Sequence, residues 1–179
     1  MAENDDLAEI IIGCKRGDAS SFSQLVDMYA RRCYGYFYRL TGSRDVSDDL
    51  LSELFVKLVE RINTYKGGAF EGWLFRVASN VFHDYLRGKQ RRERMLKAEK
   101  RQIESQAVGA RQFDKEEIDR LQERLGKLDE DTREVIILRF YSQVSFKEIA
   151  AMRSEPIGTT LSKLHRGLKK LRELMEQKL

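Results

Sequence analysis

Apolar side chains recur every three or four residues along most of the chain, which is the pattern of helices that bury one face. Gly17, Thr41-Gly42-Ser43 and Gly67-Gly68 interrupt this pattern in the first half. The apolar sets between these breaks are Leu7, Ile10, Ile11 and Cys14; Phe22, Leu25, Val26, Tyr29, Cys33 and Phe37; Leu50, Leu51, Leu54, Phe55, Leu58 and Ile62; and Trp73, Leu74, Val77, Ala78, Val81, Phe82 and Tyr85. No stretch keeps the two-residue alternation of a half-buried strand. The pattern therefore predicts an all-α fold.

The second half continues with the same helical spacing. Its apolar sets are Ile118, Leu121, Leu125 and Leu128; Val135, Ile136 and Phe140; Ile149 and Ala150; and Ile157, Leu161, Leu164, Leu168, Leu171 and Met175, the last expected to form a buried seam. Residues 93–115 are charged and lack a fixed period, which is typical of a linker that is helical in part. We therefore expect two small helical domains, residues 1–94 and 114–179, joined by a charged linker over 95–113.

Short polar side chains indicate where the helices begin, because they cap backbone N–H groups that have no partner within the helix. The expected caps are Ser21 and Ser145, which are followed by Gln24 and Glu148 at capping-box spacing, then Asp45 or Ser47, and Asp131 or Thr132. Ser154-Glu155-Pro156 predicts a tight break before the last helix.

Basic residues gather in two runs, although the formal net charge is only +4, from 33 Lys+Arg and 29 Asp+Glu. The runs span 87–101 and 163–172, and each lies at the end of an amphipathic helix. Such clusters attract phosphates and release condensed counterions. One run alone is typical of a solvated helix face, whereas two favour nucleic acid as the partner.

Several classes of protein are disfavoured by the sequence. No apolar run approaches the length that crosses a bilayer, and the acidic N-terminal segment does not resemble a signal peptide. The two cysteines, Cys14 and Cys33, lie on apolar helix faces and are expected to be core residues in a reducing compartment. His83 and His165 are far apart, and neither metal-ligand spacing nor a Gly-rich phosphate loop occurs. We therefore expect a cytoplasmic protein with no membrane insertion, catalytic residue, metal or cofactor.

Residues 145–166 have the pattern of a helix-turn-helix: a short capped helix with Ala150 at its centre, a tight turn and a longer helix. Hydrogen-bonding and cationic side chains are expected on the outer side of the second helix, where they could reach base edges. They are Thr159, Thr160, Ser162, Lys163, His165 and Arg166. A generic helical hairpin with a charged face is the alternative.

Residues 64–92 carry a second nucleic-acid signal. The aromatic residues Tyr65, Phe70, Trp73 and Phe75 interleave with Lys66, Arg76, Asn80, His83, Arg87 and the Arg91-Arg92 pair. Aromatic faces stack exposed bases while cations follow the backbone, so this composition suits single strands. The alternative is that the aromatic residues are core, and we expect this of Trp73 and Phe82.

Three motifs resemble one known family. Val46-Ser47-Asp48-Asp49-Leu50-Leu51-Ser52-Glu53-Leu54-Phe55 is similar to the segment with which bacterial sigma factors bind core RNA polymerase. Trp73-Leu74-Phe75-Arg76-Val77-Ala78-Ser79-Asn80, with Asp84 and Leu86-Arg87, resembles the helix that reads the −10 promoter element. Phe146–Ala150, Pro156–Thr159 and Ser162–Arg166 resemble the helix-turn-helix that reads the −35 element. Their order and spacing are similar to the extracytoplasmic-function (ECF) group of the sigma-70 family.

The resemblance implies a protein that directs core RNA polymerase to promoters, reads the −35 duplex, captures the melted −10 strand, and is held by an anti-sigma factor. The implied polymerase-binding residues are Asp48, Asp49, Leu50, Ser52, Glu53 and Phe55. The implied −10 residues are Lys66, Phe75, Arg76, Ser79, Asn80, His83, Asp84 and Arg87, beside a pocket for a flipped base near residues 63–70. The implied −35 residues are Gly158, Thr159, Thr160, Ser162, Lys163, His165 and Arg166.

The chain departs from the family pattern at three places: Ser52 replaces the usual Gln, Ser154 replaces the usual Gly, and Thr160-Leu161-Ser162-Lys163 replaces the common Val-Lys-Ser-Arg. Two other functions remain open on the sequence alone. One is a dimeric helix-turn-helix repressor that binds a palindromic duplex without polymerase. The other is an adaptor that binds only proteins, for which the two basic runs would have no role.

Overall fold

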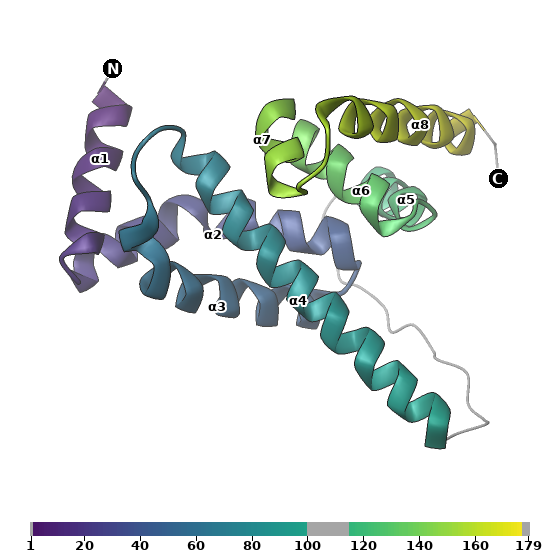
Figure 1. The fold of residues 1–179 in the computed structure, drawn as a ribbon, viewed down its shortest axis with the longest axis horizontal. Helices are drawn as coiled ribbons and strands as arrows, with labels where there is room; N and C mark the ends of the chain where they lie inside the picture. Colours follow the sequence, from purple (N-terminus) through teal and green to yellow (C-terminus); the bar gives the residue numbers. More distant parts are fainter. Residues whose placement is uncertain (1, 100–114, 177–179) are drawn as a thin grey trace.

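The computed structural model describes residues 2–99 and 115–176, and every regular element in these ranges is helical, which confirms the predicted all-α fold (Figure 1). The first half contains α1 (Ala2–Lys15), α2 (Ala19–Thr41), α3 (Arg44–Arg61), η1 (Ile62–Thr64) and α4 (Phe70–Glu99). The second half contains α5 (Lys115–Gly126), α6 (Glu130–Ile136), the π-helical turn η2 (Ile137–Tyr141), α7 (Phe146–Met152) and α8 (Ile157–Glu176). The last residues of α4 fall in the predicted linker, and the rest of that linker lies outside the described residues.

Of the helix starts predicted from the sequence, the Ser145 capping box is confirmed and the other three are wrong. Ser145 Oγ accepts a hydrogen bond from the N–H of Glu148, and the Glu148 carboxylate accepts one from the N–H of Ser145. The observed caps elsewhere are Asp18 for α2, Ser43 for α3 and Asp129 for α6. Each of these residues precedes the predicted cap and has extended backbone, so its side chain reaches the N–H three positions later.

The first half is a bundle in which α2, α3 and α4 bury one face each, while α1 lies across one end (Figure 1). Fully buried side chains in this bundle include Tyr36 and Phe37 of α2, Leu54 and Leu58 of α3, and Leu74 and Phe75 of α4. The rings of Tyr36 and Phe75 meet edge to face with centroids 5.4 Å apart. This core fixes the outward faces of α3 and α4.

In the second half, α8 packs across α6 through a face that differs from the predicted seam. Leu164 is buried as expected, but Leu161 is 43% exposed and Leu168 is 36% exposed. The buried positions beside Leu164 are instead Thr160 and Gly167. A Cβ at Gly167 would lie 2.3 Å from Thr132 Cγ2 of α6, so glycine permits this close approach. The small residues turn α8 so that part of its apolar seam faces outward.

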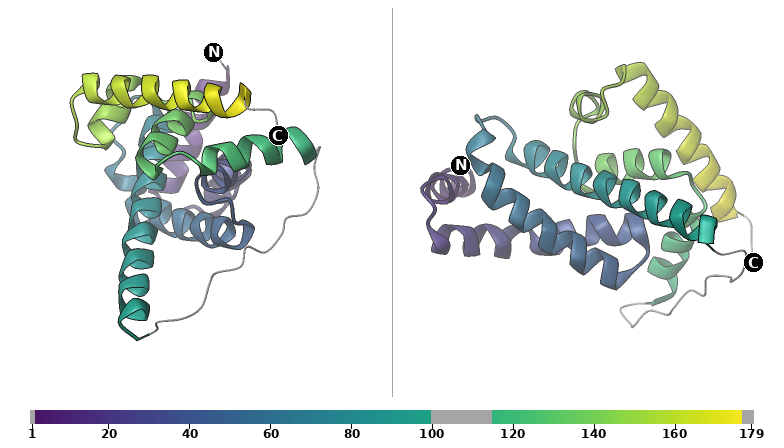
Figure 2. Two further views of the ribbon diagram at one scale, coloured as in Figure 1. Left: turned by 90° about the vertical axis from the view of Figure 1, so that its right-hand side faces the viewer. Right: turned by 60° about the horizontal axis from the view of Figure 1, so that its bottom comes forward.

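The two halves pack against each other, with α5 to α8 on one side of α2 and α4 (Figures 1 and 2). The guanidinium of Arg39 lies 3.8 Å from the ring centroid of Tyr141, and Arg133 Nη1 donates to the Leu40 carbonyl oxygen at 2.7 Å. Buried apolar residues of both halves form one continuous cluster. The second half therefore covers part of the surface that α2 and α4 would otherwise expose.

Candidate nucleic-acid interface

The loop between η1 and α4 depends on two glycines with left-handed backbone. Gly67 and Gly68 have φ values of 99° and 92°, a region that other residues rarely adopt. Tyr65 Oη donates to the Gly68 carbonyl oxygen at 2.6 Å, and Lys15 Nζ of α1 donates to the Tyr65 carbonyl oxygen at 2.6 Å. The loop is thus held both by its own side chain and by α1.

A cavity of about 750 Å³ lies between this loop and α1. Tyr65, Phe70, Ile11 and Lys15 contribute to its lining, and the Tyr65 ring packs on Phe70 and Trp73 with centroids 5.3 and 5.6 Å away. Its volume falls in the range of small-ligand sites, and its walls combine aromatic and aliphatic groups with two lysines and the carboxylate of Glu71. The cavity lies where the sequence resemblance implied a pocket for a flipped base.

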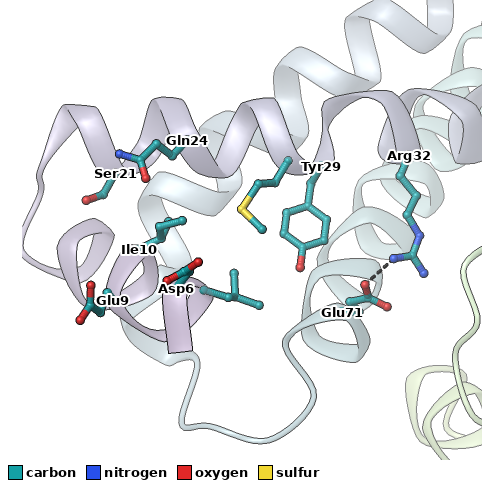
Figure 3. Close-up of a pocket in the computed structure, with 10 residues that line it drawn as sticks. Asp6, Glu9, Ile10, Ser21, Gln24, Tyr29, Arg32 and Glu71 are labelled. Atoms are coloured by element: carbon teal, nitrogen blue, oxygen red, sulfur yellow. Dashed lines mark hydrogen bonds and ion pairs between the residues drawn. The ribbon is translucent and has the colours of Figure 1, made fainter. Parts of the chain in front are cut away.

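A second depression, of about 1050 Å³, lies between α1, α2 and the start of α4 (Figure 3). Arg32 and Glu71 form an ion pair on one side of it, and Asp6 and Glu9 of α1 line the other (Figure 3). Burial raises the pKa of Tyr29 in this depression to about 12, and the charge of Glu71 adds to the effect. Three carboxylates around one already paired guanidinium repel phosphates, so this depression is a poor nucleic-acid site.

The polar side of α4 divides into an exposed part and a covered part. The exposed part holds Arg76, Asn80, Asp84 and Arg87, and the covered part holds the buried Ser79 and the half-buried His83. Arg87 forms an ion pair with Asp84. Lys66, at the loop cavity, is also exposed. The −10 residues implied by the resemblance are therefore brought to one side of the first half, but the second half covers two of them.

Besides Ser79, which the second half covers, three more of the predicted contact residues are not on the surface, which corrects their assignment to direct contacts. Phe75, Leu50 and Thr160 are 0%, 3% and 0% exposed. Phe75 packs edge to face on Tyr36, and Leu50 belongs to the core. Thr160 Oγ1 donates to Glu155 Oε1 at 2.8 Å. Matching a motif identifies the segment that recognises a partner, whereas packing decides which of its residues face that partner.

The outward face of α3 carries acids next to apolar side chains. Asp48, Asp49, Ser52 and Glu53 are exposed, and Phe55 is half-buried. The sequence interpretation missed Val56 and Val59, which are 57% and 56% exposed on the same helix. An acidic stripe beside exposed valines suits a partner with both cationic and apolar groups.

The predicted helix-turn-helix is present as α7, a turn and α8. Ser154 in the turn has a φ of 51°, so it adopts the left-handed conformation at the position where the family commonly has glycine. Lys163 on α8 is largely buried by an ion pair with Glu155, whose carboxylate oxygen lies 2.6 Å from Lys163 Nζ. The implied −35 residues that remain exposed are Gly158, Thr159, Ser162, His165 and Arg166. They lie in the N-terminal part of α8, and residues 157–166 of this helix include no Asp or Glu.

A buried carboxylate that the sequence interpretation missed links the two halves. Glu134 of α6 is 1% exposed and accepts hydrogen bonds from Tyr36, Ser79 and Arg153, with His83 as a further partner. Burial raises its pKa, but the bonds from His83 and Ser79 and the charge of Arg153 outweigh burial, so the net pKa is below its usual value. No local sequence signal identifies this residue, because its partners in the first half are at least 51 residues away.

Two further findings concern the described residues only. Within 2–99 and 115–176, no helix combines the length and apolar character needed to span a membrane. Over the same ranges, no cluster of three or more His, Cys, Asp or Glu side chains could hold a metal ion.

Comparison with known families matches both halves of the chain. The family model for Sigma-70 region 2 matches residues 25–92, and that for Sigma-70 region 4 matches residues 118–171. The ECF RNA polymerase sigma-E factor of Escherichia coli K12 is 30% identical over 164 residues, which is 86% of this chain and 85% of that protein. The chain belongs to the ECF RNA polymerase sigma factors of the sigma-70 family. It therefore functions in promoter-directed initiation of transcription, which replaces the repressor and adaptor alternatives.

Other similar proteins support the assignment. The ECF sigma factor SigE of Mycolicibacterium smegmatis is 31% identical over 162 residues, which is 87% of this chain and 62% of that longer protein. The sigma factor RpoE of Bartonella quintana, solved in complex with the anti-sigma factor NepR, has a TM-score of 0.75 at 25% identity, over 90% of this chain and 100% of that one.

The matched regions assign each surface of this sigma factor to one half. The region 2 match contains the outward face of α3, the glycine loop and the polar side of α4. The region 4 match contains the helix-turn-helix. Helix α1 precedes the region 2 match, yet it contributes one wall of the loop cavity.

Proposed function

We propose that this sigma factor captures one strand of the melted −10 element along α4 and inserts a flipped base into the loop cavity. Aromatic side chains and the exposed Lys66 line the cavity, and α4, which begins at its wall with Phe70, carries the exposed Arg76 and Asn80 further along. Separating two strands costs about 1.4 kcal/mol per base step, and stacking on aromatic side chains returns about 1–3 kcal/mol per captured base. Binding can therefore drive strand opening without any reaction catalysed by this chain.

The −35 element is proposed to receive the N-terminal part of α8 in its major groove. Thr159, Ser162, His165 and Arg166 are exposed hydrogen-bonding or cationic side chains on this part of the helix. Lys169, Lys170 and Arg172 follow on the same helix, are also exposed, and would contact phosphates.

Core RNA polymerase is proposed to bind the outward face of α3 through Asp48, Asp49 and Glu53, with Val56 and Val59 adding apolar contact. The domains would be residues 1–94 and 114–179, with 95–113 as a linker that lets each reach its own target. The chain would act in the cytoplasm, where polymerase and promoter are found.

An anti-sigma factor is the proposed inhibitor. The Bartonella quintana RpoE structure contains its anti-sigma factor NepR, and that sigma factor resembles this chain across both halves. We expect a one-to-one complex of this chain with an anti-sigma factor that prevents binding to core polymerase. Co-purification of core polymerase with that complex would contradict this expectation.

The observation that carries the proposal is the cavity at the start of α4, the helix that carries the exposed polar side chains. It can be tested with holoenzyme and promoter fragments in which 2-aminopurine replaces each −10 base in turn. One position should become strongly fluorescent on opening, because its base leaves the stack. Lys66→Ala should weaken this signal and run-off transcription, whereas Lys127→Ala, which removes a cation exposed in the second half, should leave both unchanged. A uniform signal at all positions, or equal loss in both variants, would contradict base capture at this cavity.

A further inference from the structure

The carboxylate of Glu134 is held mainly by side chains from the other half of the chain. Its Oε1 accepts hydrogen bonds from Tyr36 Oη at 3.1 Å and from Ser79 Oγ at 2.7 Å. Its Oε2 lies 2.9 Å from His83 Nε2 and accepts a bond from Arg153 Nη1. Only Arg153 belongs to the same half as Glu134. Burying a charged carboxylate is unfavourable unless its oxygens are paired in this way. The partners from the first half are available to Glu134 only while the two halves are packed together, which we call the closed arrangement.

Two of these partners are also candidate contacts for the −10 strand. Ser79 and His83 lie on the polar side of α4, next in sequence to the exposed candidates Asn80 and Asp84 respectively. A hydroxyl and an imidazole that donate to a carboxylate offer the same hydrogen bonds to a phosphate or a base acceptor. The carboxylate of Glu134 therefore occupies a position that a group of the −10 strand could take.

Other hydrogen bonds between the halves join the second half to α2. Arg133 Nη1 donates to the Leu40 carbonyl oxygen at 2.7 Å, and Arg32 Nη2 donates to the Ser142 carbonyl oxygen at 2.8 Å. These bonds hold the second half against α2. Among the hydrogen bonds between the halves within the described residues, those to Glu134 are the ones that reach the candidate −10 side chains.

We propose that the second half of this chain is an internal competitor of the −10 strand, with Glu134 occupying the hydrogen-bonding site that Ser79 and His83 offer to DNA. This inference rests on the proposed −10 function of α4. The occupant is the α6 segment of the same chain, and DNA binding requires that it leave. Its departure leaves no isolated charge, because Glu134 keeps Arg153 as its partner and water can replace the three donors from the first half.

The inference can be tested with two variants that weaken the closed arrangement from opposite sides. In Glu134→Gln the side-chain amide must face at least one of the four donors with its own N–H groups. In Tyr36→Phe a single donor is lost, and neither Arg153 nor a candidate DNA contact changes, so this variant is informative even if Glu134→Gln disturbs the second half. Glu130→Gln is the matched control, because Glu130 is exposed one turn earlier on α6.

Two measurements on the full chain are needed. Spin labels at Asp27→Cys and Glu173→Cys, two exposed positions in different halves, report the distance between the halves. Native Cys14 and Cys33 are buried, and burial raises the pKa of both thiols, so they react slowly with the label. Binding of a fluorescent single-stranded −10 oligonucleotide reports access to α4.

Glu134→Gln and Tyr36→Phe should both broaden the distribution of distances between the spin labels. Both should also bind the oligonucleotide about tenfold more tightly than the wild type, because the loss of one hydrogen bond to a charged group changes an affinity by about this factor. The control should match the wild type in both measurements. Unchanged affinity in variants whose halves have separated would overturn the competition, and unchanged distances would overturn the role of Glu134. Absence of oligonucleotide binding even by wild-type holoenzyme would instead contradict the proposed −10 function itself.

Discussion

Replacing Gly35 by alanine tests whether the two halves are docked in solution. Gly35 lies within α2 and faces Tyr141 of η2. A Cβ at this position would lie 1.9 Å from Tyr141 Oη and 2.8 Å from Tyr141 Cζ. The ring cannot easily yield, because the Arg39 guanidinium lies 3.8 Å from its centroid. Gly35→Ala should therefore push η2 away from α2.

The sign of the effect distinguishes docked from separate halves. Within a helix, replacing glycine by alanine stabilises by about 1 kcal/mol, because alanine loses less backbone entropy. Overpacking of a filled interior costs about 1–3 kcal/mol. If Tyr141 packs on Gly35, the two effects leave a net destabilisation of up to about 2 kcal/mol. If the halves do not meet here, the substitution should stabilise the chain by about 1 kcal/mol.

Urea unfolding followed by circular dichroism measures this difference as a change in the free energy of unfolding. Gly88→Ala in α4 is the matched control, because its Cβ would meet nothing nearer than Arg92 Nη1 at 3.5 Å, an ordinary contact. The control should gain about 1 kcal/mol. Adding Tyr141→Ala to Gly35→Ala should remove the clash, so Gly35→Ala should be less damaging in that background than alone. Equal stabilisation by Gly35→Ala and Gly88→Ala would refute the docked arrangement.

Three further outcomes are expected. Asp49→Lys should weaken binding to core polymerase without changing the melting temperature. Asp27→Lys, an exposed charge reversal on α2, should leave the binding unchanged. Equal affinity of the two variants in a pull-down would remove the α3 face from the interface. The hydrogen bond to Glu134 raises the pKa of His83, with burial and Arg153 opposing and the charges of Glu134 and Asp131 adding to the rise. The stability that protonated His83 contributes is full below about pH 6.5 and is lost as the pH rises through the higher folded-state pKa. The free energy of unfolding should therefore fall as the pH rises above about 6.5, and it should fall less in His83→Gln. If the exposed Arg166 contacts a phosphate, Arg166→Ala should reduce the slope of log affinity for the −35 element against log salt concentration by about one. If Arg166 reads a guanine, the variant should instead relax the preference at one base position. An unchanged slope and an unchanged preference would place Arg166 outside the groove.

Local sequence patterns determined the helices and the turns between them. Helical periodicity identified the apolar face of each long helix in the first half, and α2 ends at the predicted break, where the structure shows Gly42 in a left-handed conformation. The Ser145-x-x-Glu148 box started α7 as expected. These features were readable because each depends on residues within one or two turns of each other. The family motifs were readable for the same reason, since each is a contiguous segment.

Tertiary packing decided which residues of those segments are accessible. Leu161 and Leu168 have the spacing of a buried seam, yet Thr160 and Gly167 take the inner positions because only small side chains let α8 approach α6. Glu134 looked like an ordinary charged residue next to an apolar one. Its burial depends on Tyr36, 98 residues earlier, and on Ser79, 55 residues earlier. A periodic pattern shows which residues share one face of a helix. Which segment packs on that face depends on contacts between residues far apart in the sequence, and a short stretch of sequence does not include both partners.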